Sequence, residues 1–570
     1  MKKFVNRPED VVDEMLDGLI ILHPGLARLC GHNVVVRTDV DAVRDTQVAI
    51  LAGGGSGHEP AHAGYVGAGM LSAAVAGAVF TSPSSDSIFA VIKAVAGRPG
   101  ALLVVKNYTG DRLNFGVAAE MARAEGIPVE IIIVNDDVAL KGAALATGAR
   151  GLAGTVLIHK LVGAAAAEGK SLPELAALGR AAVKALATMG VSFSAGTSPT
   201  VGRPSFELGG DEMELGLGIH GEPGVQRTKL QPAARVTEIL LTDILKYGQF
   251  GEQKRVVVMV NNLGATTEME LAIVARHVVP FLESKGLAVE RIYAGTFLSS
   301  LDMAGISISV LGVDDERLGW LDAATAAPAW PNASKQRPGK RQAAVESEAE
   351  SSFRGTVVPV QASTTLRRAV EAACEALISA EPDLTELDRL TGDGDLGISM
   401  ERGANAVLAR VDTYPLGDVP ATLKSIGNTL RRELGGSSGP LYGVLFLRCG
   451  RVLEAAGAAG LAEWAEALAQ GSAAITELGG AKAGDRTMLD ALDPFVKALR
   501  DAAVGDAPVE VSLKNAVEAA ERGAEATAHM KPRLGRSSYL GDRVIGHVDP
   551  GAKAVAIWLR AAVEAGRYSE

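Results

Sequence analysis

His220 lies in a glycine-rich run, residues 216–224, which reads Gly-Leu-Gly-Ile-His-Gly-Glu-Pro-Gly. The glycines deny this histidine ordinary core packing, so it is either a turn residue or a group presented to a ligand. An imidazole with an unperturbed pKa near ~6.5 is largely neutral at neutral pH, and the neutral ring can attack a carbonyl carbon. The run therefore indicates a candidate nucleophile.

Two further runs in the first half combine glycine or polar residues with groups that bind ligands. Residues 53–57, followed at once by His58, come after an apolar run, and consecutive glycines let the backbone approach a small ligand closely. Residues 106–111 supply a cation, Lys106, and a carboxylate, Asp111. Both runs have plainer alternatives, since glycines also turn the chain and Lys106 could pair with Asp111 at the surface.

Three carboxylates of the second half, Asp388, Asp393 and Asp395, fall within eight residues. They repel one another unless cations lie between them, and ligation by oxygen alone favours Mg²⁺ or Ca²⁺. An EF-hand is excluded, because counting from Asp393 places Ala404 at the twelfth position, where that loop needs glutamate. The alternative is a solvated acidic turn.

Several glycine-rich runs of the second half precede predicted helices. Residues 435–439 carry the hydroxyls of Ser437 and Ser438 just before a predicted helix over 441–456, and a helix N-terminus binds phosphate without a net positive charge. A Walker A loop is absent, because Asp485 occupies the position in 479–485 where lysine would stand. The runs 484–490, 535–541 and 546–551 could each, taken alone, be a helix cap.

The elements that hold the first-half residues alternate between apolar runs and helical patterns. Such runs are typical of strands buried on both faces, and ligands bind at the carboxyl ends of strands in open α/β sheets. The predicted strands are 48–51, 102–105, 131–134, 256–260 and 306–311, and the predicted helices are 84–96, 114–125, 152–168 and 232–246. We therefore expect an α/β domain over 1–330, with two subdomains that divide near 185–195.

The second half changes to a helical period, with about eight helical segments between 364 and 565 and hardly any strand-like run. It predicts an all-α domain over 356–570. Between the halves, residues 331–355 hold two prolines, a basic cluster and then several glutamates, a composition typical of a solvated linker.

Composition limits the function classes further. The chain has 570 residues, 47% of them hydrophobic, which indicates a globular protein of several domains. Its net charge of -11 leaves no broad basic surface of the kind that binds nucleic acid or an anionic membrane. Three scattered cysteines argue against a disulfide framework and fit a cytoplasmic protein. Acidic residues interrupt the first 22 positions, so no signal peptide is expected there, and no apolar stretch predicts a membrane span.

The three first-half runs, together with Phe-Thr-Ser-Pro-Ser at 80–84, resemble the substrate-binding domain of dihydroxyacetone kinases. In that family the histidine matching His220 forms a covalent hemiaminal with the substrate ketone, the aspartate matching Asp111 is the base, and the histidine matching His58 hydrogen-bonds the substrate. His220, Asp111 and His58 are thus the implied catalytic residues. The resemblance implies substrate binding by Gly55, Ser56, Gly57, His58, Ser82, Lys106, Asp111 and His220.

The second-half motifs, in their order, resemble the nucleotide-binding domain of the same kinases, which is a barrel of antiparallel helices. The resemblance implies two Mg²⁺ ions on Asp388, Asp393 and Asp395 that clamp the phosphates of ATP. Leu396 departs from the pattern, because some relatives carry a polar residue there. The implied nucleotide-binding residues are Gly397, Ile398, Ser399, Met400, Ser437, Ser438, Gly484, Thr487, Met488, Arg536, Asp549, Pro550 and Gly551.

The resulting expectation is an ATP-dependent kinase of dihydroxyacetone, in which covalent capture separates ketones from glycerol, a polyol without a carbonyl. The alternatives are a subunit-type relative that takes phosphate from a phosphoprotein, a kinase of erythrulose or glyceraldehyde, and a non-catalytic ligand-binding regulator. A tether between the two halves favours the ATP form, because it holds acceptor and donor at high effective concentration. The resemblance also implies a homodimer in which domains serve each other's chains, and animal relatives cyclise FAD as well.

Overall fold

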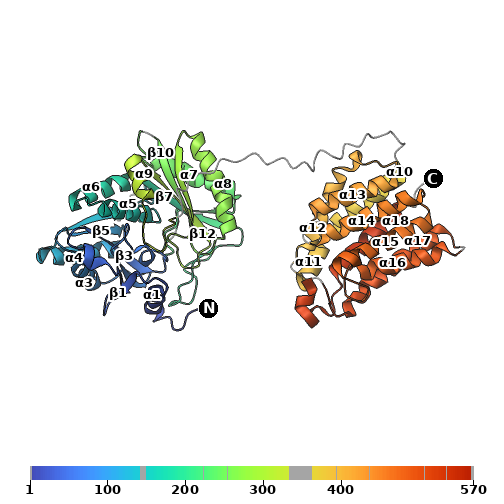
Figure 1. Cartoon of the computed structure of the whole chain (residues 1–570), viewed down its shortest axis with the longest axis horizontal. Coiled ribbons are helices and arrows are strands. Elements are labelled where there is room, and N and C mark those ends of the chain that lie inside the picture. The colour runs from blue at the N-terminus through green and yellow to red at the C-terminus, as the bar shows by residue number, and fades with distance from the viewer. Residues whose placement is uncertain are drawn as a thin grey trace. The chain divides into compact units, whose positions relative to one another are not determined.

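The computed structural model describes residues 3–141, 149–222, 224–252, 254–332, 363–392, 394–434, 437–505, 507–534 and 536–566. The chain divides into two units, Met1–Ala344 and Val345–Glu570, and each contains its own hydrophobic core (Figure 1). The predicted linker, 331–355, falls almost entirely on residues outside the described part, so its bounds stay a prediction.

The first sheet of the first unit has parallel strands in its middle and on one edge, and antiparallel strands on the other edge. Its strands, in spatial order, are β1 (Leu26–Arg28), β2 (Val34–Arg37), β4 (Ala73–Val79), β3 (Ala49–Ser56), β5 (Ala101–Lys106) and β6 (Val129–Val134). Alternate residues of β3 and β5 point into two different cores, so both faces of the sheet are covered, as their apolar sequences predict.

Helices cover both faces of this sheet (Figure 1). One face packs on α3 (Ser85–Val95) and α4 (Thr109–Ala124), and the other on α1 (Val11–Leu22), α5 (Thr155–Ala167) and α6 (Leu172–Lys184). Two short helices, α2 (Val40–Val43) and the 3-10 helix η1 (Ala63–Tyr65), lie in the connections.

The second sheet begins with β7 and shares a core with the first. Its strands, in spatial order, are β11 (Ala288–Gly295), β10 (Arg255–Asn262), β12 (Gly305–Gly312), β7 (Leu186–Ser192), β8 (Glu212–Leu215) and β9 (Gln226–Lys229). One face packs on α7 (Ala233–Tyr247) and α8 (Glu268–Ser284). The other face, with α9 (Asp315–Asp322), joins the core that also contains α5 and α6.

All the predicted strands and helices of the first unit occur, with two differences that matter for the site. Residues 53–55 are the last part of β3 and not a turn after it, because they pair with β4 beyond Ala52, the last residue of β3 that pairs with β5. Helix α4 begins at Thr109, five residues before the predicted start, so Asp111 lies in its first turn. Both differences place polar groups at the carboxyl ends of β3 and β5.

The second unit is a closed ring of eight helices, in which each helix contacts the next and the last contacts the first. The ring consists of α10 (Thr364–Ser379), α12 (Leu396–Leu408), α13 (Val419–Glu433), α14 (Ser438–Ala456), α15 (Leu461–Gly479), α16 (Leu489–Ala503), α17 (Val509–Ala526) and α18 (Pro550–Gly566). A further helix of the described part, α11 (Glu381–Thr391), packs on α12 and α18, and the prediction of an all-α domain with about eight helices is confirmed. Among the residues described there, 3-10 segments occur at η3 (Val411–Thr413), η4 (Thr527–His529) and η5 (Arg536–Val544), the last of which is interrupted at Gly541.

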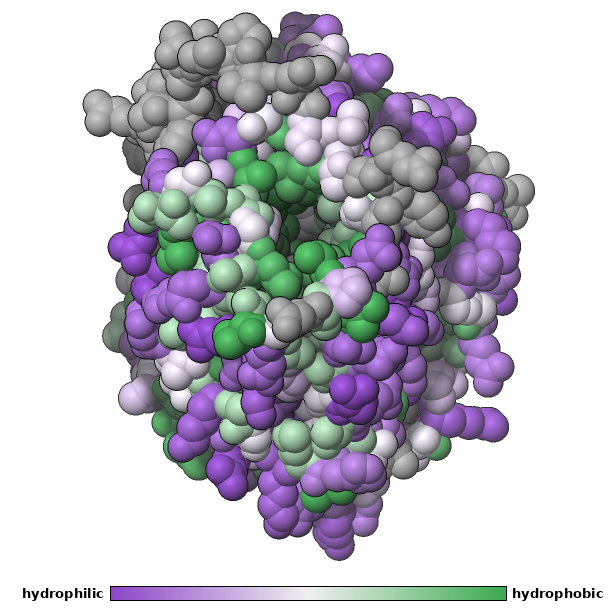
Figure 2. All heavy atoms as spheres, turned by 90° about the vertical axis from the view of Figure 1, so that its right-hand side faces the viewer, coloured by the Kyte–Doolittle hydropathy of each residue, from purple (hydrophilic) through white to green (hydrophobic). Residues whose placement is uncertain are grey.

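The ring encloses an apolar cavity of about 740 Å³, and Figure 2 shows a hollow lined by hydrophobic residues. Its lining includes Leu366 in the first turn of α10, the first residues of α15 and α17 and the last residue of α18, so these four ends lie at one end of the ring. Short connections make the neighbours from α12 to α17 antiparallel, and α18 ends where α10 begins. The opposite end therefore carries the N-termini of α12, α14, α16 and α18. Within the described residues, no helix is both long and apolar enough to span a membrane.

Candidate active site

The carboxyl ends of two neighbouring parallel strands bring the predicted substrate residues of the first unit together. Strand β3 ends at Ser56 and leads to His58, and β5 ends at Lys106 and leads into α4 with Asp111. A Cβ built on Gly54 would lie 3.3 Å from Lys106 Nζ and 3.6 Å from an oxygen of Asp111. The cation and the carboxylate thus lie over the same glycine, and the absence of a side chain there leaves them room.

The two predicted histidines face each other although they come from different sheets. The rings of His58 and His220 meet edge to face with their centroids 4.8 Å apart. His58 Nδ1 lies 2.9 Å from the carbonyl oxygen of Ser299, and its Nε2 is buried without a hydrogen-bond partner. A carbonyl only accepts, so Nδ1 donates and Nε2 carries the lone pair. His58 can therefore accept a proton or hydrogen bond from a ligand.

Residues 299–301 connect the two histidines. Besides the Ser299 carbonyl on His58, the Ser300 hydroxyl donates to the carbonyl of Ile219, the residue before His220, at 2.6 Å. Leu301, with a φ of 56°, donates its N–H to the carbonyl of Gly57 at 2.8 Å. No sequence pattern indicated this segment, because its contact with His58 joins residues 241 positions apart in the chain.

Two aromatic rings enclose His220 together with His58. The rings of Tyr108 and Phe80 approach His220 edge to face at 4.5 and 5.4 Å, and Phe80 also stacks on His58 at 5.1 Å. The Tyr108 hydroxyl is buried without a partner, and burial, with Glu222 nearby, raises the pKa of this phenol well above its usual range. Neither ring was predicted from the sequence, although both lie inside the runs that carry the motifs.

Glu222 is a further group that the sequence analysis missed. One of its carboxylate oxygens lies 3.0 Å from His220 Nδ1, and the other accepts the backbone N–H of His220 at 2.9 Å. Burial raises the pKa of this carboxyl, but the hydrogen bonds from His220 outweigh burial and hold it at about 2. His220 Nε2 is the ring nitrogen that this contact leaves for a ligand.

Lys106 sets the electrostatics of the pocket. Its ammonium nitrogen is buried without a hydrogen-bond partner, so burial lowers its pKa while the charges of Asp111 and Glu222 raise it. Burial first and the charge of Lys106 second lower the pKa of His58 well below its ordinary value. His58 is therefore neutral at physiological pH.

The remaining predicted substrate residues form the rim of the pocket. A Cβ on Gly55 would lie 2.5 Å from the Thr81 nitrogen, and a Cβ on Gly57 would lie 2.9 Å from the Phe80 ring, so the glycine strand and residues 80–82 are in direct contact. The hydroxyl of Ser56 donates to the carbonyl of Gly77 at 2.7 Å and serves the backbone. The hydroxyl of Ser82 is buried without a partner.

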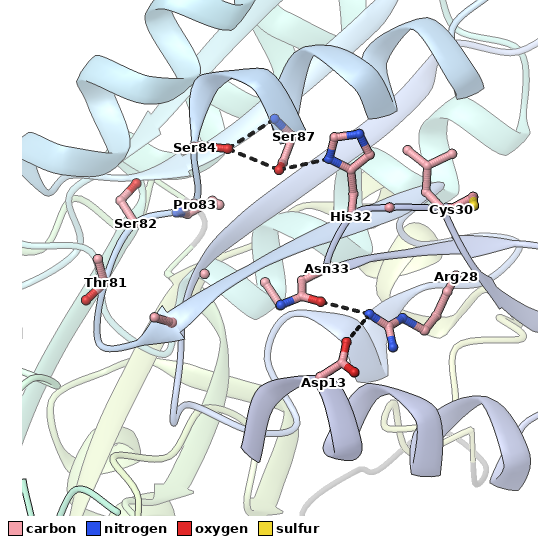
Figure 3. Close-up of a pocket in the computed structure, with 15 residues that line it drawn as sticks. Asp13, Arg28, Cys30, His32, Asn33, Thr81, Ser82, Pro83, Ser84 and Ser87 are labelled. Atoms are coloured by element: carbon pink, nitrogen blue, oxygen red, sulfur yellow. Dashed lines mark hydrogen bonds and ion pairs between the residues drawn. The ribbon is translucent and has the colours of Figure 1, made fainter. Parts of the chain in front are cut away.

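Ser82 also borders a polar groove of about 760 Å³ (Figure 3). The opposite wall is held together by its own hydrogen bonds, in which His32 bonds Ser87 at 3.1 Å and Arg28 bonds Asp13 and Asn33 at 2.6 and 2.8 Å. These groups bond one another, whereas the hydroxyl of Ser82, which lines the groove and is a predicted substrate residue, has no partner in the described structure.

A second histidine pair lies in the interior beside the site. His62 Nδ1 and His159 Nε2 are 2.9 Å apart, and the other nitrogen of each ring is buried without a partner. His159 falls within the predicted helix 152–168, and because α5 is buried on nearly all sides its partner is another buried side chain and not solvent. Burial lowers its pKa to about 3, so this ring is neutral.

The predicted nucleotide residues of the second unit gather at the starts of four ring helices. Gly397, Ile398, Ser399 and Met400 form the first turn of α12, and Ser437 and Ser438 begin α14, whereas Gly435 and Gly436 lie outside the described residues. Gly484, Thr487 and Met488 precede α16, and Asp549, Pro550 and Gly551 begin α18. The backbone of Arg536 lies in η5, which contacts α11. These helix N-termini share one end of the ring and together favour a bound anion.

Hydrogen bonds hold two of these loops together. Asp490 accepts the backbone N–H groups of Gly484 and Thr487, the latter at 2.7 Å. Arg486, a buried residue with a φ of 64°, donates to the carbonyl of His547 at 2.9 Å and lies 3.7 Å from Asp549. Burial raises the pKa of Asp549 to about 6, although the Ala552 N–H and Arg486 oppose this. The loop before α16 is thus fixed against the start of α18.

Two of the three predicted metal ligands can be placed. Asp388 is buried near the end of α11, and one of its oxygens accepts the N–H groups of Asp395 and Leu396 at 2.9 and 3.1 Å. A Cβ on Gly392 would lie 2.4 Å from the other oxygen, so the loop leaves room around it. Asp393 lies outside the described residues. Carboxylate oxygens in a loop of this kind fit a hard cation such as Mg²⁺.

Comparisons with known proteins cover nearly the whole chain. Residues 17–329 match the Dak1 domain and residues 390–564 match the DAK2 domain. The chain is 46% identical to a tomato protein named putative 3,4-dihydroxy-2-butanone kinase, with 98% of this chain and 97% of that protein covered. It is 43% identical to human triokinase/FMN cyclase, with 99% of each chain covered.

A solved structure agrees with these matches. The crystal structure of the dihydroxyacetone kinase from C. freundii in complex with AMP-PNP and Mg²⁺ superposes with a TM-score of 0.62 at 34% identity and covers 99% of both chains. Both domain types of the family thus occur in one polypeptide, in the order that the sequence motifs indicate, and the chain belongs to the dihydroxyacetone kinase family of enzymes.

Proposed function

We propose that this enzyme transfers the γ-phosphoryl group of ATP to a hydroxyl of dihydroxyacetone, which gives dihydroxyacetone phosphate. The observation that carries the proposal is the first-unit pocket, where a histidine with one available ring nitrogen faces a second, neutral histidine beside a buried lysine and a carboxylate. The names of the relatives support the same reaction class. One solved relative binds an ATP analogue with Mg²⁺.

In the first step, His220 holds the ketone covalently. The Nε2 lone pair forms a bond to the carbonyl carbon, and the π electrons of the C=O bond move to the oxygen, which takes a proton from water. The ring releases the proton of Nδ1 to the hydroxide that remains, which restores the water, so the hemiaminal is neutral and the count of protons is unchanged. Capture immobilises a small substrate that few contacts could orient.

In the second step, Asp111 accepts the proton of the substrate hydroxyl as its oxygen attacks the γ-phosphorus, and ADP leaves with the electrons of the broken P–O bond. Lys106, His58 and Ser82 would orient the substrate through hydrogen bonds. In the second unit, Asp388, Asp393 and Asp395 would hold two Mg²⁺ ions. Bound Mg²⁺ would offset the charge that develops on the phosphates.

The nucleotide would lie at the end of the helix ring where α12, α14, α16 and α18 begin. The hydroxyls of Ser437 and Ser438 and the exposed backbone N–H groups of the first helical turns supply donors for phosphate oxygens. This mode of binding does not depend on net charge, which explains how a chain with a net charge of -11 could bind ATP.

The decisive test is the choice between a ketone and a polyol. His220→Ala should lose the discrimination between dihydroxyacetone and glycerol that the wild-type enzyme shows in a ³²P-ATP assay with purified protein alone. His277→Ala, on α8, serves as the control. Unchanged selectivity in His220→Ala would contradict covalent capture, and phosphorylation only with a phosphoprotein donor would contradict ATP as the donor.

Closely related substrates are the second candidate, because relatives carry the names 3,4-dihydroxy-2-butanone kinase and triokinase/FMN cyclase. Dihydroxyacetone, erythrulose, 3,4-dihydroxy-2-butanone and glyceraldehyde all present a carbonyl to His220. The ratio of kcat/KM values across this panel, with FAD as a separate substrate for cyclisation, would assign the preference.

We also propose a homodimer in which the nucleotide domain of one chain serves the other chain. Sedimentation, and the mixing of two variants that each lack one active domain, would test this.

A further inference from the structure

The two oxygens of Glu222 are both engaged by a single residue, His220. One faces the ring nitrogen Nδ1 at 3.0 Å, and the other accepts the backbone N–H at 2.9 Å. The contact is largely shielded from water, since the His220 side chain is 18% exposed and that of Glu222 is 34% exposed. A carboxylate only accepts hydrogen bonds, so in the neutral ring Nδ1 must carry the proton and Nε2 the lone pair.

A glycine in the turn around His220 leaves space for this carboxylate. A Cβ on Gly218 would lie 2.0 Å from the Glu222 oxygen that binds the backbone N–H, so any larger residue would displace the carboxylate. The turn is fixed from outside by Arg150, which donates to the carbonyl of Gly216 at 2.6 Å and to Asp137 at 2.7 Å. The Ser300 hydroxyl on Ile219 fixes the same turn from the other side.

We infer that Glu222 is a positioning residue that sets the tautomer of His220, and that Gly218 is glycine in order to accommodate it. The inference rests on the proposed capture of a ketone by His220. Only the tautomer with a lone pair on Nε2 can attack the carbonyl carbon. As the new C–N bond forms, positive charge grows on the ring, and Glu222 lies next to Nδ1 to offset it until Nδ1 releases its proton.

Glutamine at this position has a defined effect. His220 presents two N–H groups to Glu222, and an amide has a single oxygen to accept them. The backbone N–H cannot change its role, so it takes the amide oxygen, and the amide NH₂ then faces Nδ1. A donor at Nδ1 requires the lone pair there, which moves the ring proton to Nε2. Glu222→Gln should therefore reverse the tautomer and remove the nucleophile without changing the shape of the side chain.

The experiment is ¹⁵N NMR of the full-length enzyme labelled at histidine, of which the chain has nine. His220 is assigned from the signal missing in His220→Ala, and the ring nitrogen that carries the proton identifies the tautomer. We expect Nδ1–H in the wild-type enzyme without substrate and Nε2–H in Glu222→Gln. Gly218→Ala, which displaces an intact glutamate, should give a mixture of the two tautomers.

Glu214→Gln is the matched control, because Glu214 holds the same loop through the backbone N–H of Gly224 at 2.8 Å without contacting His220. It should keep the wild-type tautomer. Binding should follow the spectra: the apparent dissociation constant for dihydroxyacetone should rise about 10- to 100-fold in Glu222→Gln, as for a lost hydrogen bond to a charged group, with MgATP binding unchanged.

Two outcomes would overturn the inference: Nδ1–H in both Glu222→Gln and Gly218→Ala, or an equal loss of the wild-type tautomer in Glu214→Gln. The first would show that Glu222 does not set the tautomer, and the second that any loosening of the loop does. A failure of the proposed function would give a different result. If His220 does not capture the ketone, the His220 signals of the wild-type enzyme would not change when dihydroxyacetone is added. The comparison of tautomers in the substrate-free enzymes would still test the role of Glu222.

Discussion

At the scale of single residues, the two histidines of the pocket owe their chemistry to different neighbours. His58 is deprived of water and lies near the buried ammonium of Lys106, and both effects favour its neutral form. His220 takes its orientation from Glu222 and from the rings of Tyr108 and Phe80. The pocket therefore presents two imidazole nitrogens with lone pairs to one small volume.

Tyr108 offers a direct test of substrate binding, because its hydroxyl can be removed without changing the ring. Its hydroxyl is buried without a partner in the described structure, next to His220, so we expect it to bond a hydroxyl of the substrate. Tyr108→Phe should raise KM for dihydroxyacetone up to about tenfold, as for one neutral hydrogen bond, with an unchanged melting temperature. Steady-state kinetics and calorimetry check this, and an unchanged KM would exclude the contact.

Lys160 should impose a pH dependence on stability. Its ammonium donates to the carbonyl of Trp320 at 2.7 Å between α5 and α9, and burial lowers its pKa to about 8. Between about pH 8 and 10.5 the unfolded chain binds a proton that the folded chain has lost, so the free energy of unfolding should rise with pH across this window.

Replacement by methionine removes the buried charge. Lys160→Met should raise the free energy of unfolding at pH 7 by about 1–3 kcal/mol, and the rise above pH 8 should disappear. Urea unfolding at pH 7 and pH 9.5 measures both effects. Equal pH slopes for the two proteins would show that Lys160 is not the group that titrates.

At the scale of elements, the strands and helices could be predicted because apolar periodicity reports burial directly. The end of β3 could not, since glycines carry no hydrophobic signal, and only pairing with β4 makes residues 53–56 a strand. The candidate site was predicted at the motif residues and missed at Glu222, Tyr108 and residues 299–301, because spatial contacts between distant segments leave no mark on a single sequence.

The close contact between β3 and residues 80–82 predicts a specific defect. In Gly55→Ala the new methyl group would lie 2.5 Å from the Thr81 nitrogen and 2.7 Å from the Phe80 carbonyl carbon, so the rim that carries Ser82 must shift. The free energy of unfolding should fall by about 1–3 kcal/mol, and KM for dihydroxyacetone should rise. Gly116→Ala, in an open position on α4, should instead gain about 0.5–1 kcal/mol. Equal effects in both variants would contradict the contact.

At the scale of the whole molecule, the two units have separate hydrophobic cores and bind different ligands in the proposed function. Calorimetry should therefore resolve two unfolding transitions. Because a ligand stabilises the state that binds it, MgATP should raise one transition temperature and dihydroxyacetone the other. EDTA should cancel the MgATP shift alone. A single transition that both ligands raise would show that the units unfold as one.

The hydrogen bonds of residues 299–301 have a consequence for folding. The carbonyl of Ser299 positions His58, which is 241 residues away along the chain, and the hydroxyl of Ser300 positions the turn of His220. Contacts between residues this far apart in the sequence form slowly, since the chain must first close a long loop. During refolding, helix content should return before the capacity to bind a ketone. The refolding enzyme should therefore become active late, only after the second sheet has packed against the first.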